Sequence, residues 1–168
     1  MAYGIVRTDN MYGTDVRAAL VSIKYMGADG STPTAIENGN VLKVGALING
    51  EREVYVGGKV AADDKATDIV LIASPEVMYD ERKKNLDEFI NEAGKACRGY
   101  RLHSGDIFSV TKDALAGKAT PAVGDVVELA AGTKLKVAAT ATSGSTAIGS
   151  VIDVNVVGRY TYYAIKVN

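Results

Sequence analysis

The sequence has few of the residues on which many small enzymes and metalloproteins depend. Its 168 residues include no tryptophan, one cysteine (Cys97) and one histidine (His103). A single cysteine excludes a disulfide within the chain, and one cysteine with one histidine cannot supply the ligands of a structural zinc site. We therefore predict no metal site and no cofactor, and we expect the chain to be made in a reducing compartment, the cytoplasm.

Long apolar runs and an excess of one charge are also missing. No apolar segment follows Met1, and no run is long enough to cross a bilayer, which predicts neither a signal peptide nor a transmembrane helix. The 19 basic and 20 acidic residues give a formal net charge of -1. Nucleic-acid binding and electrostatic attachment to membranes both need a basic surface, so we predict neither partner.

Catalytic patterns are weak. Cys97 and His103 stand six positions apart and would form a nucleophile and a base if a bend brought them together. No third group that would orient the histidine is indicated, and no phosphate-binding loop or calcium-loop spacing is present. We predict no catalytic residues and no enzyme activity, and a hydrolase that uses Cys97 and His103 remains the enzymatic alternative.

The residues that are abundant favour β structure. Alternation or continuous apolar character predicts strands at 19–26, 69–73, 132–137, 150–157 and 159–167. Asn49-Gly50 separates two further strand patterns, 41–47 and 53–56, and therefore predicts a hairpin. Gly105-Asp106 and Gly124-Asp125 each precede a short strand pattern, so a turn is expected to open both strands.

One segment has a helical pattern. Ser74 and Pro75 are suitable N-terminal residues, and Leu86, Phe89, Ile90 and Ala93 recur at helical spacing before Gly94. We therefore predict an α-helix near 75–94. The fold class expected is α+β, mostly antiparallel β with one main α-helix and a small C-terminal part like a β-barrel or sandwich. The expected division is an N-terminal arm at 1–18, an α+β part at 19–98 and a barrel-like part at 99–168.

Tyrosine dominates the aromatic residues, with nine Tyr and two Phe. Tyrosine is favoured at protein interfaces because one end of its side chain is apolar and the other tolerates water. The arm and the last strand carry such tyrosines. The predicted interface with other subunits consists of Tyr3, Arg7, Tyr12, Tyr160 and Tyr162.

Four stretches together resemble a family. They are IENGNVLKVGALINGEREVY (36–55), SPEVMYDERKKNLDEFINEAGK (74–95), YRLHSGDIFSVT (100–111) and VVGRYTYYAIKV (156–167). The chain resembles small proteins of tailed phages and prophages of Gram-positive bacteria that are encoded beside the major capsid protein. The resemblance covers most of the chain after residue 35.

The resemblance implies a structural virion protein. Such a capsid decoration protein would bind the outer surface of a tailed-phage head, stabilise it, contact the major capsid protein and form a homotrimer with itself. An arm at residues 1–18, with Tyr3 and Tyr12, would form part of the docking surface. Two alternatives stay open: a tail tube or baseplate component, and a β module that binds a host surface or carbohydrate through Tyr160, Tyr162 and Tyr163.

Overall fold

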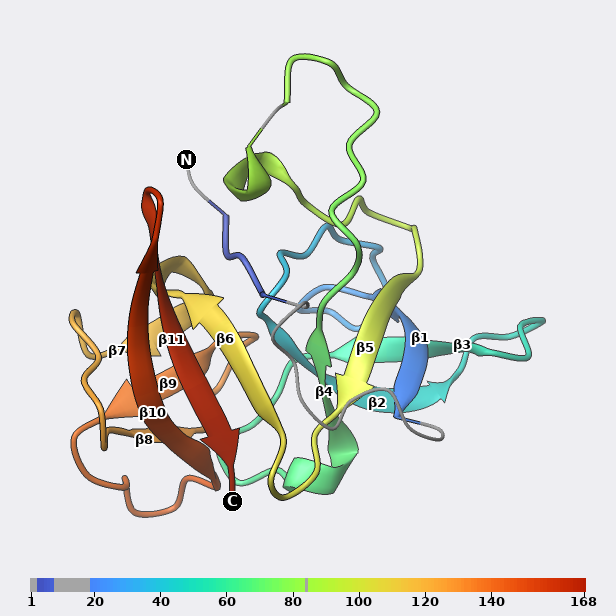
Figure 1. Cartoon of the computed structure of the whole chain (residues 1–168). Helices are drawn as coiled ribbons and strands as arrows, with labels where there is room; N and C mark the ends of the chain where they lie inside the picture. The colour runs from blue at the N-terminus through green and yellow to red at the C-terminus, as the bar shows by residue number, and fades with distance from the viewer. Residues whose placement is uncertain (1–2, 8–18, 84) are drawn as a thin grey trace.

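The first half of the chain folds into a closed β-barrel in the computed structural model, which describes residues 3–7, 19–83 and 85–168 (Figure 1). Within those residues the barrel has the order β1-β3-β2-β4-β5 and closes because β1 pairs with both β3 and β5. The β1–β3 pair is parallel and the other pairs are antiparallel. The strands are β1 (Leu20–Tyr25), β2 (Val41–Leu47), β3 (Val54–Gly58), β4 (Ile69–Ile72) and β5 (Cys97–Arg101).

The second half forms a six-stranded sheet that curls into a half-barrel, hereafter the curled sheet. Among the described residues its order is β6-β11-β10-β8-β9-β7, with β7 and β9 parallel and its other pairs antiparallel. Its strands are β6 (Ile107–Thr111), β7 (Leu115–Gly117), β8 (Val126–Glu128), β9 (Leu135–Ala138), β10 (Ala147–Val157) and β11 (Tyr160–Val167).

Strand β4 shows how the two sheets share the hydrophobic core. All of its residues are buried. Val70 and Ile72 face the barrel interior with Ile23, whereas Ile69 and Leu71 pack with residues of the curled sheet such as Phe108. Alternate side chains of a strand point to opposite faces, so a strand between two apolar layers needs apolar residues at every position. The strand predicted at 69–73 is confirmed as β4, and it is buried on both faces.

Most strands predicted from local patterns are present. The hairpin around Asn49-Gly50 is confirmed as β2 and β3, with Leu47 opposite Tyr55. The two Gly-Asp turns share one geometry: Gly105 and Gly124 have φ of 93° and 92°. In each turn the aspartate carboxylate accepts a main-chain N–H three residues earlier, over 2.8 Å for Asp106 and 2.7 Å for Asp125. The repeated dipeptide therefore marks a repeated turn that starts β6 and β8.

The predicted α-helix at 75–94 is wrong, and with it the α+β fold class. The protein is all-β, and its described residues include no helix of seven or more residues. The helical pattern yields one 3₁₀ turn, Leu86–Glu88, after which Phe89 is extended with ψ of 135°. The N–H and C=O of Asn91 bond to Ile36 over 3.0 Å in both directions. This sheet-like pairing needs extended backbone, so a tertiary contact overrides a helical periodicity that was only local.

The part at 99–168, expected to be like a β-barrel or sandwich, forms the curled sheet and not a closed barrel. The closed barrel spans 20–101, and the curled sheet stays open between its edge strands β6 and β7. These two strands follow each other in the chain, joined by the short turn Lys112–Ala114, yet they pair with different neighbours. On the side away from β11, β6 pairs with the N-terminal segment through a bridge between Val6 and Val110.

Candidate interaction site

Residues 3–7 lie along the outer edge of β6. The Arg7 N–H donates to the Ser109 carbonyl over 2.9 Å, and the Thr111 N–H donates to the Ile5 carbonyl over 3.1 Å. Ile5 and Val6 are buried, at 2% and 3% exposed. The segment thus acts as a short antiparallel strand of the curled sheet, and it covers an edge that would otherwise be free.

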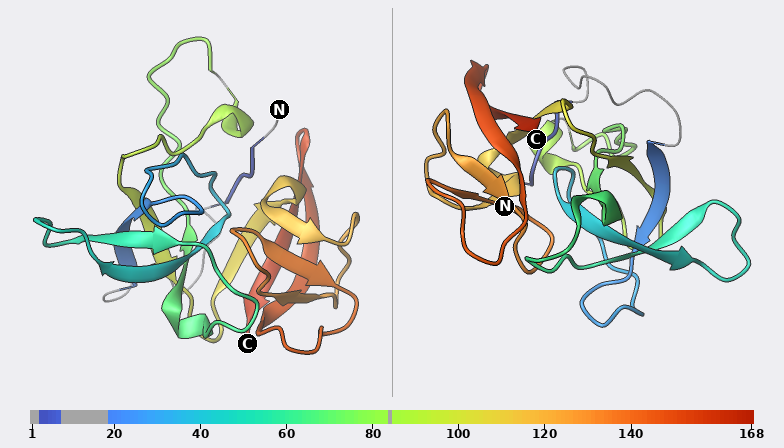
Figure 2. Two further views of the ribbon diagram at one scale, coloured as in Figure 1. Left: turned by 180° about the vertical axis from the view of Figure 1, so that it is seen from behind. Right: turned by 90° about the horizontal axis from the view of Figure 1, so that it is seen from below.

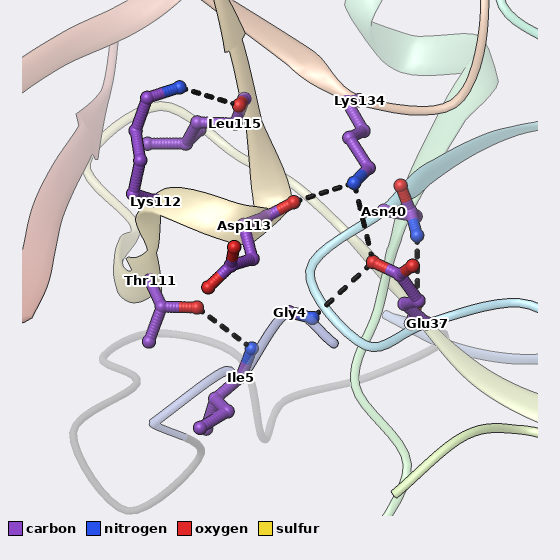
Figure 3. Close-up of polar contacts among 9 residues, drawn as sticks. All are labelled: Gly4, Ile5, Glu37, Asn40, Thr111, Lys112, Asp113, Leu115 and Lys134. Atoms are coloured by element: carbon purple, nitrogen blue, oxygen red, sulfur yellow. Dashed lines mark hydrogen bonds and ion pairs between the residues drawn. The ribbon is translucent and has the colours of Figure 1, made fainter. Parts of the chain in front are cut away.

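Polar contacts hold the start of this segment between the two sheets (Figure 3). The Gly4 N–H donates to Glu37 Oε2 over 3.3 Å, and Lys134 Nζ lies 3.4 Å from the same oxygen. Lys134 also donates to the Asp113 carbonyl over 2.6 Å. The Ile5 N–H donates to Thr111 Oγ1 over 3.1 Å. Contacts from the barrel side and from the curled sheet therefore converge on residues 4 and 5.

Beside this segment lies a cluster that we call the tyrosine face, defined as Tyr3, Arg7, Asp87, Arg159, Tyr160 and Tyr162. The Tyr160 and Tyr162 rings meet edge to face, with centroids 6.2 Å apart. The Arg159 guanidinium lies 4.8 Å from the Tyr160 ring centroid, and the Arg7 guanidinium lies 5.4 Å from that of Tyr162. Cations over aromatic faces are attracted by the ring quadrupole, so both arginines help to order the tyrosines.

Asp87 joins the parts of the tyrosine face. Its main-chain carbonyl accepts the Tyr3 N–H over 3.1 Å, and its carboxylate accepts the Tyr160 hydroxyl over 3.0 Å and forms an ion pair with Arg159. The pKa of the Arg159 guanidinium is raised by the hydrogen bond that it donates to Tyr160 and by the negative charge of the Asp87 carboxylate. One acidic residue thus ties the N-terminal segment, the 3₁₀ turn and the β10–β11 hairpin together.

Two hollows flank Tyr160. One, of about 400 Å³, is lined by residues that include Tyr3, Lys112 and Arg159. The other, of about 510 Å³, is lined by residues that include Arg7, Leu86 and Val157. A partly buried aromatic ring between two hollows offers both an anchor and recesses for side chains of a partner.

The structure brings together four of the five residues predicted for an interface. Tyr3, Arg7, Tyr160 and Tyr162 lie in the tyrosine face, whereas Tyr12 falls outside the described residues. Tyr162 is 4% exposed, so its ring is part of the subunit interior, and Tyr163 lies in the core. An interface role for these residues stays a prediction.

Sequence reasoning missed Asp87 and Arg159. Asp87 was hidden inside the helix predicted at 75–94, and Arg159 stands in a turn where an exposed charge needs no explanation. The Gly158-Arg159 pair between two strand patterns was the available signal, because a two-residue hairpin turn places its residues at a projecting tip. No local pattern indicated that Asp87 would reach it.

Cys97 and His103, the pair considered for nucleophilic chemistry, lie in surroundings that do not suit catalysis by the thiol. Cys97 lies in the barrel core, where its thiol donates to the Ile23 carbonyl over 3.1 Å, and burial raises the pKa of that thiol to about 12. A thiolate nucleophile needs the opposite, a lowered pKa and access to substrate. His103 is exposed in the loop before β6, next to Asp106. Cys97 therefore serves packing.

Metal-ligating side chains do not gather in threes anywhere in the part of the chain that the structure describes. The acidic residues Asp63 and Asp64 lie in a turn in which Asp64 accepts the Ala61 N–H over 2.7 Å and pairs with Lys43. Among the described residues no helix has the length and apolar character to span a membrane.

Comparison with known proteins finds no relative of this chain. No family model, no curated protein and no solved structure matches the chain. Fold and site therefore define its class by themselves: an all-β protein of a closed barrel joined to a curled sheet, with an aromatic and arginine-containing face beside its N-terminal segment.

Proposed function

We propose that this chain is a structural virion protein, a decoration protein that binds the outer surface of a tailed-phage head and stabilises it. The observation that supports the proposal most is the tyrosine face. Tyrosine and arginine are enriched at protein interfaces, where a few such residues in the centre supply most of the binding energy.

The tyrosine face is ordered before any partner arrives. Tyr160 is held by Asp87 through its hydroxyl and by Arg159 over its ring. An anchor that is already fixed loses less side-chain entropy on binding, which leaves more of the contact energy for affinity. Such an anchor suits a lasting contact with the major capsid protein.

The role also fits modest affinity for each copy. A shell presents the same site many times, so a protein that contacts neighbouring capsid subunits is retained by repeated contacts. The sequence resemblance implies this arrangement. The carbohydrate-binding alternative has less support, because Tyr162 is 4% exposed and Arg7 lies over its ring.

The test uses DNA-filled heads produced by the genome that encodes this chain, prepared without the chain itself. Purified chain is added, and co-sedimentation and the temperature of genome release are measured. We expect binding and a higher release temperature. A Tyr160→Ala variant should bind about thirtyfold more weakly, the effect of losing a central anchor worth about 2 kcal/mol.

Tyr79→Ala is the matched control, because Tyr79 is 94% exposed on a loop away from the tyrosine face. It should bind like the wild type. Urea unfolding of both variants shows whether Tyr160→Ala still folds. Absence of binding by the wild-type chain, with rings or tubes in electron micrographs, would instead place the protein in the tail.

A further inference from the structure

We propose that the outer edge of β10, residues 152–157, pairs with the same edge of a second copy of this chain. This free edge adjoins the tyrosine face at Val157, which lines one of the hollows beside Tyr160, and the proposal does not rest on the function proposed above. Figures 1 and 2 show the tip of the β10–β11 hairpin projecting beyond the rest of the curled sheet.

The free edge begins where β8 ends. β10 pairs with β8 through residues 147–150, and the last contacts on that side are at Val151, which exchanges main-chain bonds of 2.8 and 2.9 Å with Gly124 and Asp125. From Ile152 to Val157 the ladder continues with β11, but no strand of the described residues pairs on the other side.

The orientation of the free edge follows from the hairpin. Val157 and Tyr160 face each other across the two-residue turn Gly158-Arg159. Such a turn is flanked by a hydrogen-bonded pair, and bonded and non-bonded pairs alternate along an antiparallel ladder. Val154 and Val156 therefore turn their N–H and C=O groups toward the free edge, where they are open to another strand.

Four of the six side chains at this edge are apolar and accessible. Ile152, Val154 and Val157 are 39%, 38% and 43% exposed, and Val156 is 67% exposed. Edge strands are usually protected by lysine, proline or a bulge within the exposed stretch. The bulge here precedes the stretch, between Val151 and Asp153, and Ile152 to Val157 contains no Lys, Arg or Pro.

The hairpin of β2 and β3 has an exposed edge that can be compared with the edge of β10. The end of β2 beyond Lys43 also lacks a second neighbour among the described strands, since β4 pairs only with residues 41–43. Its exposed stretch, however, includes Gly45 and Ala46 and is interrupted by a register shift between Val44 and Leu47. Glycine and bulges weaken strand pairing, so the β2 edge is protected from pairing with another chain and the β10 edge is not.

The β10 edge is complementary to itself. In an antiparallel pair centred on Asn155, Val154 of each copy stands opposite Val156 of the other, and their outward N–H and C=O groups form about four main-chain hydrogen bonds. Asp153 then stands opposite Val157 and diagonal to Arg159 of the other copy, a residue of opposite charge that also pairs with Asp87 of its own chain. This self-complementarity identifies a second copy as the partner.

The test is sedimentation equilibrium of the full chain across a concentration series. The wild type should change reversibly from the 17.6 kDa monomer to twice that mass. Val156→Lys and Val154→Lys should weaken association about tenfold or more, because they put like charges across the two-fold axis. Leu47→Lys, which introduces the same charge on the β2 edge, should associate like the wild type. Denaturant midpoints confirm that all variants fold.

A wild-type chain that stays monomeric at every concentration, or a dimer that persists in both valine variants, would overturn the pairing. A homotrimer would overturn it too, while leaving the decoration function standing. Conversely, dimers that fail to bind heads would support the pairing and refute the proposed function. Amide exchange at Val154 and Val156 should slow as the dimer forms, which locates the interface directly.

Discussion

The hydroxyl of Tyr160 donates a hydrogen bond to Asp87 Oδ1 over 3.0 Å, although 73 positions separate the two residues in the sequence. The bond joins the start of the last strand to a 3₁₀ turn in the loop that follows the barrel strand β4. Asp87 also accepts the Tyr3 N–H through its carbonyl. Three distant segments are thus brought to one surface by one acidic residue.

Removing only the Tyr160 hydroxyl tests this link. We expect Tyr160→Phe to lower the free energy of unfolding by about 1 kcal/mol, the net value of one hydrogen bond to a charged or polar partner. Asp87→Ala should cost more, since it also leaves Arg159 without this carboxylate. Urea unfolding monitored by circular dichroism measures both changes. Tyr79→Phe, at a position that is 94% exposed, should leave stability unchanged.

Alanine substitutions at two glycines with the same backbone conformation distinguish the cost of backbone strain from the cost of a steric clash. Gly39 and Gly50 have φ of 82° and 84°, but a Cβ at Gly39 would lie 2.6 Å from the Ala114 Cβ, whereas one at Gly50 meets nothing within 4 Å. Gly50→Ala should cost about 1–2 kcal/mol from the left-handed conformation. Gly39→Ala should cost about 1–3 kcal/mol more, because the two sheets would have to separate.

Equal losses of stability in the two alanine variants, measured by denaturant unfolding, would mean that glycine is needed at position 39 for its backbone conformation alone and that the contact with Ala114 relaxes freely. The comparison therefore measures how tightly the barrel and the curled sheet are joined at this point.

Glu128 makes stability depend on pH. Its side chain is fully buried; burial raises its pKa, but hydrogen bonds from Lys136 and from Thr142 outweigh burial, so the pKa lies below its ordinary value. A carboxyl whose pKa is lower in the folded state stabilises the fold above its unfolded pKa of about 4.3 and loses that contribution as pH falls through the folded pKa.

Glu128→Gln should therefore lower the free energy of unfolding by about 1–3 kcal/mol at pH near 7, and by less at pH near 3. Denaturant unfolding at the two pH values gives the difference. Glu81→Gln, at an exposed position, controls for the loss of one negative charge. A Glu128 effect that is the same at both pH values would contradict the ionised carboxylate.

Cys97 should be inert in the native protein. Its thiol is buried and its pKa is about 12, so a thiol-specific disulfide reagent should not react at mildly alkaline pH. After denaturation the same reagent should titrate one thiol per chain. Rapid labelling of the folded chain would contradict the packing role and would reopen a nucleophilic role for this residue.

Several elements could be read from local sequence. The hairpin around Asn49-Gly50, the buried strand at 69–73 and the two Gly-Asp turns were predicted correctly, because turn chemistry and side-chain alternation are properties of neighbouring residues. The choice of Tyr3, Arg7 and Tyr160 as interface residues drew on residue type, and the structure places them on one face.

By itself, then, the sequence determined where most of the strands and the tight turns form, but not β5 or β7. Tertiary structure decided the rest. Main-chain pairing of Asn91 with Ile36 replaced a helix that periodicity favoured, and the N-terminal segment occupied the β6 edge. The contact of Asp87 with Tyr160 exists only because long-range packing brings a loop to a hairpin. Nothing in the residues next to either one in the sequence predicts that contact.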